Sequence, residues 1–143
     1  MKFTFLFGGK KQAGLLQEGI ETYVGRIRRF FAAEMLSGKK EREISHFLKL
    51  LTRESYLIGL AEGGTSFTSE HFAGFLKGLM ERGVKEIVFL IGGADGFGPG
   101  WRERCDTILS LSPLTFSHRL ARLVLVEQVY RALSIINNTP YHR

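Results

Sequence analysis

The stretch from Lys85 to Gly93, KEIVFLIGG, constrains the fold of this 143-residue chain more than any other. Every position from Ile87 to Ile91 is apolar, so the run lacks the apolar–polar alternation of a strand with one wet face. A strand of this kind is covered on both faces, as the central strand of a parallel sheet is. The sequence therefore predicts an α/β fold whose sheet carries helices on both faces.

Apolar strand-like runs alternate with amphipathic helical segments along the rest of the chain. We expect strands over residues 2–7, 32–36, 56–62, 85–93 and 107–112. We expect helices over 12–31, 39–55, 69–82 and 118–137, with a loop over 94–101 and a short helix ending near 105. Strands that alternate with helices form right-handed βαβ units, so the sheet should be mostly parallel. The length predicts a single domain over residues 1–143.

The charge balance and the one cysteine narrow the class of protein. A formal net charge of +6 and a pI of about 9.7 favour a polyanionic partner, with nucleic acid ahead of an anionic membrane. Cys105 excludes an internal disulfide and suits a reducing compartment. The apolar run from Phe3 to Phe7 is too short for a secretion signal, and no stretch approaches the ~18 apolar residues of a membrane span. We expect a cytoplasmic protein.

The final helix is apolar on almost all sides. Leucine, valine, isoleucine and tyrosine residues recur around it, at positions 120, 123–126, 129, 130, 133, 135 and 136. A helix of this kind is buried on more than one side. One side can face the sheet, and either the chain's own loops or a second copy covers the other. Few elements remain in so short a chain, so the pattern favours a homodimer.

Charged residues interrupt this helix, and buried charge is costly unless it is paired. We interpret Arg122 and Glu127 as an internal ion pair. The four histidines lack metal-ligand spacing and cysteine companions, so we expect no metal: His46, His71, His118 and His142. The sequence also lacks the phosphate-binding loop, the dinucleotide fingerprint and the G-x-S-x-G nucleophile elbow.

Three polar loops follow predicted strands, over residues 61–69, 91–100 and 109–118. In parallel sheets, ligands bind beyond the carboxyl ends of the strands. Glycine, serine and threonine let such loops present backbone N–H and C=O groups to a ligand. Each loop alone is equally consistent with a tight turn, but three together predict a site for a flat adenosine. The apolar contacts would come from Leu60, Leu111, Leu114 and Phe116.

The segments FLIGGADGFGP and LSLSPLTFSHRLARLVLVEQVYRALSIINNTPYHR resemble the signature of the RlmH family, SPOUT-class methyltransferases of a ribosomal large-subunit pseudouridine. The likeness covers nearly the whole chain, including MKFTFLFGGK at the start. Its most specific part is E-Q-x-Y-R-A followed by a terminal P-Y-H-R. The likeness departs at Ser117, where the family has proline, and over residues 32–40, which are shorter here.

The resemblance implies a C-terminal trefoil knot, a homodimer and S-adenosylmethionine as cofactor. It implies methylation of N3 of a pseudouridine in 23S rRNA on the assembled ribosome. It assigns the cofactor to the positions reached above and their neighbours: Leu60, Gly92, Gly93, Leu111, Ser112, Pro113, Leu114, Thr115 and Phe116. Two alternatives stay open, namely a related knotted tRNA methyltransferase and a non-catalytic basic ribosome-binding protein.

The chain ends on a stiff polar tail, TPYHR, where frayed residues are usual. By the resemblance, Tyr141, His142 and Arg143 reach toward the partner's cofactor and complete its active site. Tyr141 would stack on the base, and Arg143 would hold a phosphate or the developing oxyanion. His142 would take the imide proton, with His118 as the other candidate base.

Overall fold

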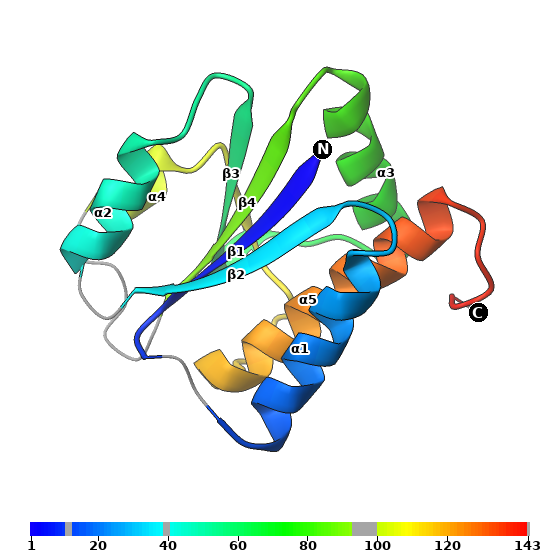
Figure 1. Ribbon diagram of the computed structural model, residues 1–143, viewed down its shortest axis with the longest axis horizontal. Helices are drawn as coiled ribbons and strands as arrows, with labels where there is room; N and C mark the ends of the chain where they lie inside the picture. The colour runs from blue at the N-terminus through cyan, green and yellow to red at the C-terminus, as the bar shows by residue number, and fades with distance from the viewer. Residues whose placement is uncertain (11–12, 39–40, 93–99, 143) are drawn as a thin grey trace.

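The computed structural model describes residues 1–10, 13–38, 41–92 and 100–142. Five parallel strands form one sheet in the order β2-β1-β4-β3-β5 (Figure 1). The strands are β1 (Lys2–Gly8), β2 (Ala32–Gly38), β3 (Ser55–Thr65), β4 (Glu86–Ile91) and β5 (Thr107–Leu109). Strand β4, which is apolar from Ile87 to Ile91, lies in the middle of this sheet, between β1 and β3, as predicted.

Helices cover both faces of the sheet (Figure 1). One face carries α1 (Leu15–Ile27), α3 (Ser69–Glu81) and α5 (His118–Ile136), and the other carries α2 (Glu41–Lys49) and α4 (Trp101–Arg104). Alternate residues of β4 supply the two cores. Ile87 and Phe89 pack in the larger core with α1, α3 and α5, whereas Val88 and Leu90 pack in the smaller one with α2. The α/β prediction is therefore confirmed.

The last helix, α5, is covered by the chain itself. It packs between α1 and α3, and its residues Leu125, Val129 and Leu133 are completely buried. Gly19 on α1 allows close approach, since a Cβ atom there would lie 3.0 Å from a methyl group of Leu123. The expectation that few elements remain to cover this helix was wrong for the sides that α1 and α3 flank, whereas Leu120 stays 38% exposed and Leu123 and Val124 are half-buried. A homodimer therefore needs support other than the apolar pattern of α5.

Several element boundaries differ from the predictions. Helix α1 begins later than expected because Gly14, with φ of +104°, ends the preceding loop and serves as the N-cap. Helix α2 ends at Lys49 instead of 55, and β5 stops at Leu109. The predicted loop over 94–101 lies largely outside the described residues.

The most consequential difference is in β3, which continues through the glycine pair that was interpreted as its end. Thr65 pairs with Leu109 of β5 beyond an irregularity in the ladder. Gly63 adopts φ of +77°, and a Cβ atom on Gly64 would lie 2.6 Å from the carbonyl oxygen of Ile108. The two glycines thus make a bulge that brings the backbones of β3 and β5 together.

No helix in the described ranges has the length and apolarity to cross a bilayer.

Candidate active site

A cavity of about 280 Å³ lies beyond the carboxyl ends of β3, β4 and β5. Six of the nine residues predicted to bind the cofactor line it: Leu60, Gly92, Leu111, Ser112, Leu114 and Phe116. Pro113 and Thr115 are exposed beside it and contribute no wall, and Gly93 lies outside the described residues. The part of β3 that continues past its pairing with β4, the end of β4 and the loop after β5 thus meet at one place, as the parallel topology requires.

Local hydrogen bonds shape the loop that follows β5. The hydroxyl of Ser110 donates to the carbonyl of Ser112 at 3.2 Å, and the hydroxyl of Ser112 accepts from the Leu114 amide at 3.0 Å. The hydroxyl of Thr115 donates to the Glu62 carboxylate at 2.6 Å. This last bond ties the loop after β5 to the extended end of β3, so Thr115 holds the cavity's shape from outside it.

The wall opposite this loop comes from α4, which sequence reasoning did not connect with the site. Trp101 lines the cavity and packs over Gly59, where a Cβ atom would lie 2.6 Å from the indole ring. Other lining residues that were missed are Ala61, Glu62, Ile91, Leu109, Ser110 and Ala121. The glycine at position 59, within an otherwise apolar strand, was the one sequence signal of this close approach.

His118 lines the same cavity from the first turn of α5. Ser117 caps that turn by accepting from the Leu120 amide at 3.3 Å, so serine performs a structural task at the position where proline was expected. Burial lowers the pKa of His118, and the charges of Arg122 and Arg119 lower it further. A neutral imidazole at the cavity wall can accept a proton.

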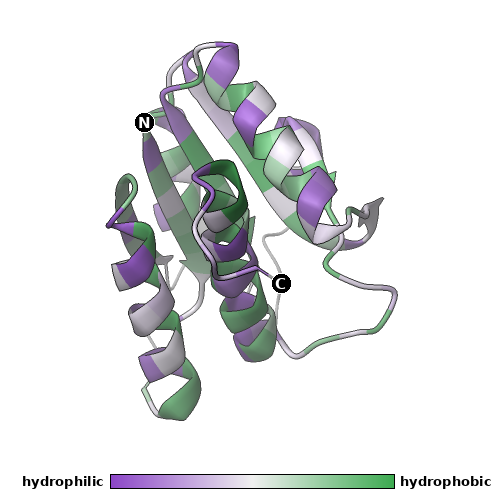
Figure 2. Cartoon of the chain, turned by 90° about the vertical axis from the view of Figure 1, so that its right-hand side faces the viewer, coloured by the Kyte–Doolittle hydropathy of each residue, from purple (hydrophilic) through white to green (hydrophobic). Residues whose placement is uncertain are grey.

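The C-terminal tail lies across α5, between α1 and α3 (Figure 2). The Tyr141 hydroxyl donates to Glu127 at 3.0 Å and lies 3.1 Å from the Tyr23 hydroxyl of α1. Its ring meets Tyr130 edge-on, with centroids 4.7 Å apart, and the Arg131 guanidinium lies 4.8 Å from its centroid. Burial and these hydrogen bonds raise the pKa of Tyr141, which keeps it a phenol.

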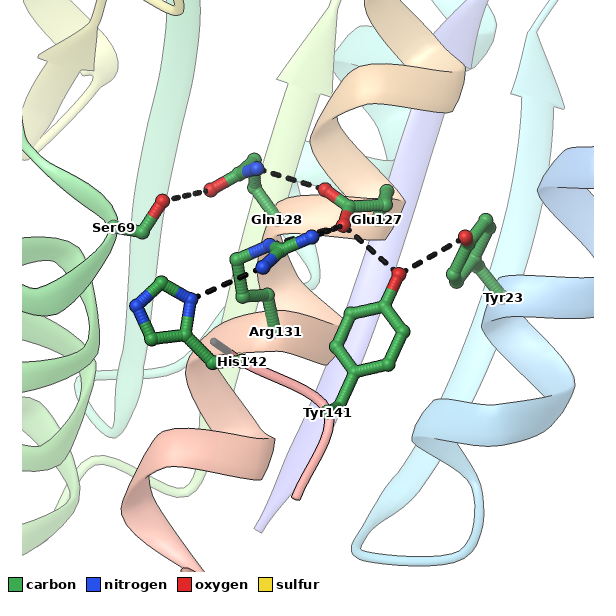
Figure 3. A network of polar contacts seen from close by, with 7 residues as sticks. All are labelled: Tyr23, Ser69, Glu127, Gln128, Arg131, Tyr141 and His142. Atoms are coloured by element: carbon green, nitrogen blue, oxygen red, sulfur yellow. Dashed lines mark hydrogen bonds and ion pairs between the residues drawn. The ribbon is translucent and has the colours of Figure 1, made fainter. Parts of the chain in front are cut away.

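His142 lies between α5 and α3 in the same network (Figure 3). Its Nδ1 is 3.0 Å from Arg131 and its Nε2 is 2.9 Å from the Glu70 carboxylate. Arginine can only donate, so Nδ1 accepts and Nε2 carries the proton that is donated to Glu70. This bond from His142 lowers the pKa of Glu70.

The predicted ion pair between Arg122 and Glu127 was wrong. Glu127 instead binds Arg131, one helical turn onward, at 2.7 and 3.0 Å, and accepts from Gln128 at 2.7 Å (Figure 3). Spacing explains the partner, since residues four apart share a helix face and residues five apart do not. Arg122 is 1% exposed, donates to the Gly8 carbonyl and lies over the Phe7 ring.

The two groups of predicted catalytic residues lie at different positions along α5. His118 is at the cavity, in the first turn, whereas the tail binds Glu127 in the middle of the helix and Arg131 one turn further on. The axial rise of an α-helix puts residues 127 and 131 about 14 and about 20 Å from residue 118. Within one chain the structure therefore does not bring Tyr141 and His142 to His118, and Arg143 is outside the described residues.

Residues 1–142 match a family model described as "Predicted SPOUT methyltransferase". The chain belongs to the SPOUT methyltransferase family. It is 40% identical over 152 aligned positions to the ribosomal RNA large subunit methyltransferase H of Geobacter metallireducens and to that of Geobacter sulfurreducens, covering 99% of both chains in each case. The protein of that name from Prochlorococcus marinus is 38% identical, with 99% of this chain and 96% of that one covered.

Among solved structures, this SPOUT chain resembles the SpoU methyltransferase AviRb from Streptomyces viridochromogenes. The TM-score is 0.55 at 14% identity, over 96% of this chain and 61% of the longer one. A second structure of AviRb, in complex with AdoMet, gives a TM-score of 0.52 at 14% identity, over 98% of this chain and 58% of that one. At this identity the likeness shows the fold alone.

Within the described ranges, no three metal-ligating side chains gather in one place.

Proposed function

We propose that this SPOUT chain transfers a methyl group from S-adenosylmethionine to N3 of a pseudouridine in 23S rRNA of the assembled ribosome, in the cytoplasm. Support comes from full-length relatives that bear the name ribosomal RNA large subunit methyltransferase H. The net charge of +6 suits an RNA substrate. The observation that carries the proposal is the convergence of the predicted loops on one cavity beside His118.

The cavity has the character that a nucleoside cofactor requires. Apolar walls from Leu60, Leu111 and Trp101 suit the faces of an adenine ring, and the strand-end loops offer backbone polar groups for its edge. Ser112 and Glu62 add polar atoms at the rim. When bound, S-adenosylmethionine supplies an electrophilic methyl group on a sulfonium. The residues of this chain hold and orient the cofactor.

In this proposal, the acceptor nitrogen would lose its imide proton to a base of this chain and would take the methyl group that the bound cofactor supplies, with the uncharged thioether as the leaving group. His118 is suited to take that proton, because its imidazole lines the cavity and is held neutral. His142 is the alternative, delivered by a second copy. Most of the rate would come from holding the acceptor in line with the methyl group.

We further infer a homodimer and the C-terminal trefoil knot of this family. The separation of about 14 to 20 Å along α5 supports the dimer, because the tail of one chain does not reach its own cavity. A second copy can place Tyr141, His142 and Arg143 beside that cavity. Pro140 stiffens the tail for this reach by fixing its own φ.

The test is a methyl-transfer assay with labelled S-adenosylmethionine and three acceptors: assembled ribosomes, free 23S rRNA and bulk tRNA. We expect one methyl group per ribosome, located on a pseudouridine by mass spectrometry of the digested rRNA, and none on tRNA. Transfer to tRNA alone would replace the proposal with a knotted tRNA methyltransferase. Failure to bind the cofactor in calorimetry would make the chain a non-catalytic ribosome-binding protein.

A further inference from the structure

A second cavity, of about 270 Å³, lies at the N-terminus of α1, outside the site described above. Its walls include Leu16, Gln17, Arg119 and Arg122. It adjoins the first cavity across the start of α5, since His118 and Ala121 line one and the next residues along the chain, Arg119 and Arg122, line the other. The two cavities are therefore separated by about one helix diameter, ~10 Å.

Arg122 is a buried cation without a carboxylate partner among the ion pairs of the described residues. One guanidinium nitrogen donates to the Gly8 carbonyl, but Nε is buried with no hydrogen-bond partner. Burial lowers the pKa of Arg122, and the charge of Arg119 lowers it further. A buried guanidinium with an unsatisfied N–H group costs several kcal/mol unless an anion compensates it.

The backbone at this cavity also favours an anion. Helix α1 starts at Gly14, which has no side chain, so no side-chain cap satisfies the amides of its first turn. These amides and the helix dipole attract negative charge at the N-terminus of a helix. Glu18 lies in the same turn but is exposed and does not line the cavity.

We propose that this cavity binds a backbone phosphate of the RNA next to the nucleotide that is methylated. That the ligand is RNA rests on the proposed function. That the ligand is a phosphate rests on the buried Arg122 and on the uncapped N-terminus of α1. A phosphate accepts from amides and guanidinium groups together. Because the cavity adjoins the cofactor cavity, a base presented to the methyl group brings its flanking phosphate within reach of Arg119 and Arg122.

The decisive variants act on Leu16, because replacing Arg122 would also remove its bond to Gly8. Leu16 is 36% exposed and lines the cavity. Leu16→Glu supplies a carboxylate that competes with the phosphate, whereas Leu16→Gln has the same size without the charge. We expect Leu16→Glu to raise KM for ribosomes about tenfold more than Leu16→Gln does, with unchanged cofactor affinity.

The salt dependence of KM for ribosomes gives a second test of the phosphate contact. One lost phosphate contact lowers the slope of log KM against log salt by about 1. Leu16→Glu should show this change. Arg29→Gln, in the exposed turn that follows α1, removes one positive charge from the chain and should leave the slope unaltered. Equal KM values and slopes for the glutamate and glutamine variants would overturn the proposal.

A direct binding measurement separates this proposal from the catalytic one. In NMR spectra of the wild-type chain, inorganic phosphate should shift the amide signals of residues 15–17 and the Arg122 Nε–H saturably, and chloride at equal ionic strength should not. The shift is expected even if no RNA is methylated. An absent shift overturns the site. A phosphate shift combined with an unaltered ribosome KM in Leu16→Glu would mean that the cavity takes a free ion, and overturns the role in RNA binding.

Discussion

The two halves of α5 have different surroundings. At its N-terminal end, loops and apolar side chains surround a cavity, with the neutral His118 at the wall. From its middle onward, Glu127 and Arg131 bind the tail through short hydrogen bonds (Figure 3). The first half has room for a ligand, and the second already holds the chain's own residues. In the proposed dimer, the reaction combines the two halves from two copies.

The largest effect is expected at the tail. Deleting residues 141–143 removes the groups that would complete the partner's site, so turnover should fall by about 100-fold or more. Dimerisation and cofactor affinity should be largely preserved, because no residue of the tail lines the cavity of its own chain. Turnover is measured as the rate of methyl transfer, dimerisation by ultracentrifugation and cofactor affinity by calorimetry. Full activity of the truncated chain would refute the tail's role.

Filling the cavity tests the other end of the helix. Ala61→Phe places a ring in the cavity, and overpacking of about 1–3 kcal/mol predicts a cofactor Kd raised about fivefold to 150-fold. The tail network should stay intact, as judged by the Tyr141 ring signals in NMR spectra. The same change at the exposed Ala32, Ala32→Phe, serves as the control and should leave Kd unaltered.

A smaller effect is expected when the hydrogen-bond network that holds the tail loses the carboxylate of Glu127. Glu127→Gln weakens bonds to Arg131 and Tyr141, and a charged hydrogen bond contributes about 1.5–3 kcal/mol. For a chain of this size, Tm should fall by about 3–12 °C. Glu81→Gln, exposed at the end of α3, is the matched control. Equal Tm values for the two variants would mean that the network contributes nothing to stability.

The smallest effect is the pH dependence of stability that comes from His118. Its pKa in the folded chain is below the ordinary 6.5, so the unfolded chain binds this proton more tightly. Stability should therefore decrease as the pH falls below about 6.5 and through the lowered pKa. His118→Asn should flatten this part of the curve of Tm against pH. An unaltered curve would mean that His118 is not held neutral by its surroundings.

Much of this arrangement was predictable from local patterns. The apolar run of β4 and the alternation of strands and helices predicted the sheet, and the parallel topology then predicted where the loops meet. Local rules failed where contacts between distant residues decide the outcome. The bulge at Gly63 and Gly64 depends on the backbone of β5, which the glycine pair alone does not reveal.

The contacts of the tail also could not be predicted from local sequence patterns. Its contacts join Tyr141 to Tyr23 and His142 to Glu70, across separations of 118 and 72 residues, and no periodicity marks such pairs. The cover of α5 by α1 and α3 was also missed, because amphipathic patterns show which face of a helix is apolar but not which helix meets it. The buried Arg122 has no local signal either, since its partner is a backbone carbonyl in β1.

Complementation between two impaired variants tests most directly whether the cavity and the tail act together across two copies. One variant carries Ala61→Phe, which fills the cavity, and the other lacks residues 141–143. The assay uses a cofactor concentration that saturates the wild-type chain but lies far below the raised Kd of Ala61→Phe. Unfolded together and refolded, half of the dimers would be mixed, each with one complete site. The account predicts recovery of about a quarter of wild-type methyl transfer to ribosomes. If the mixture stays as inactive as its two components, the tail does not complete the site of the other copy.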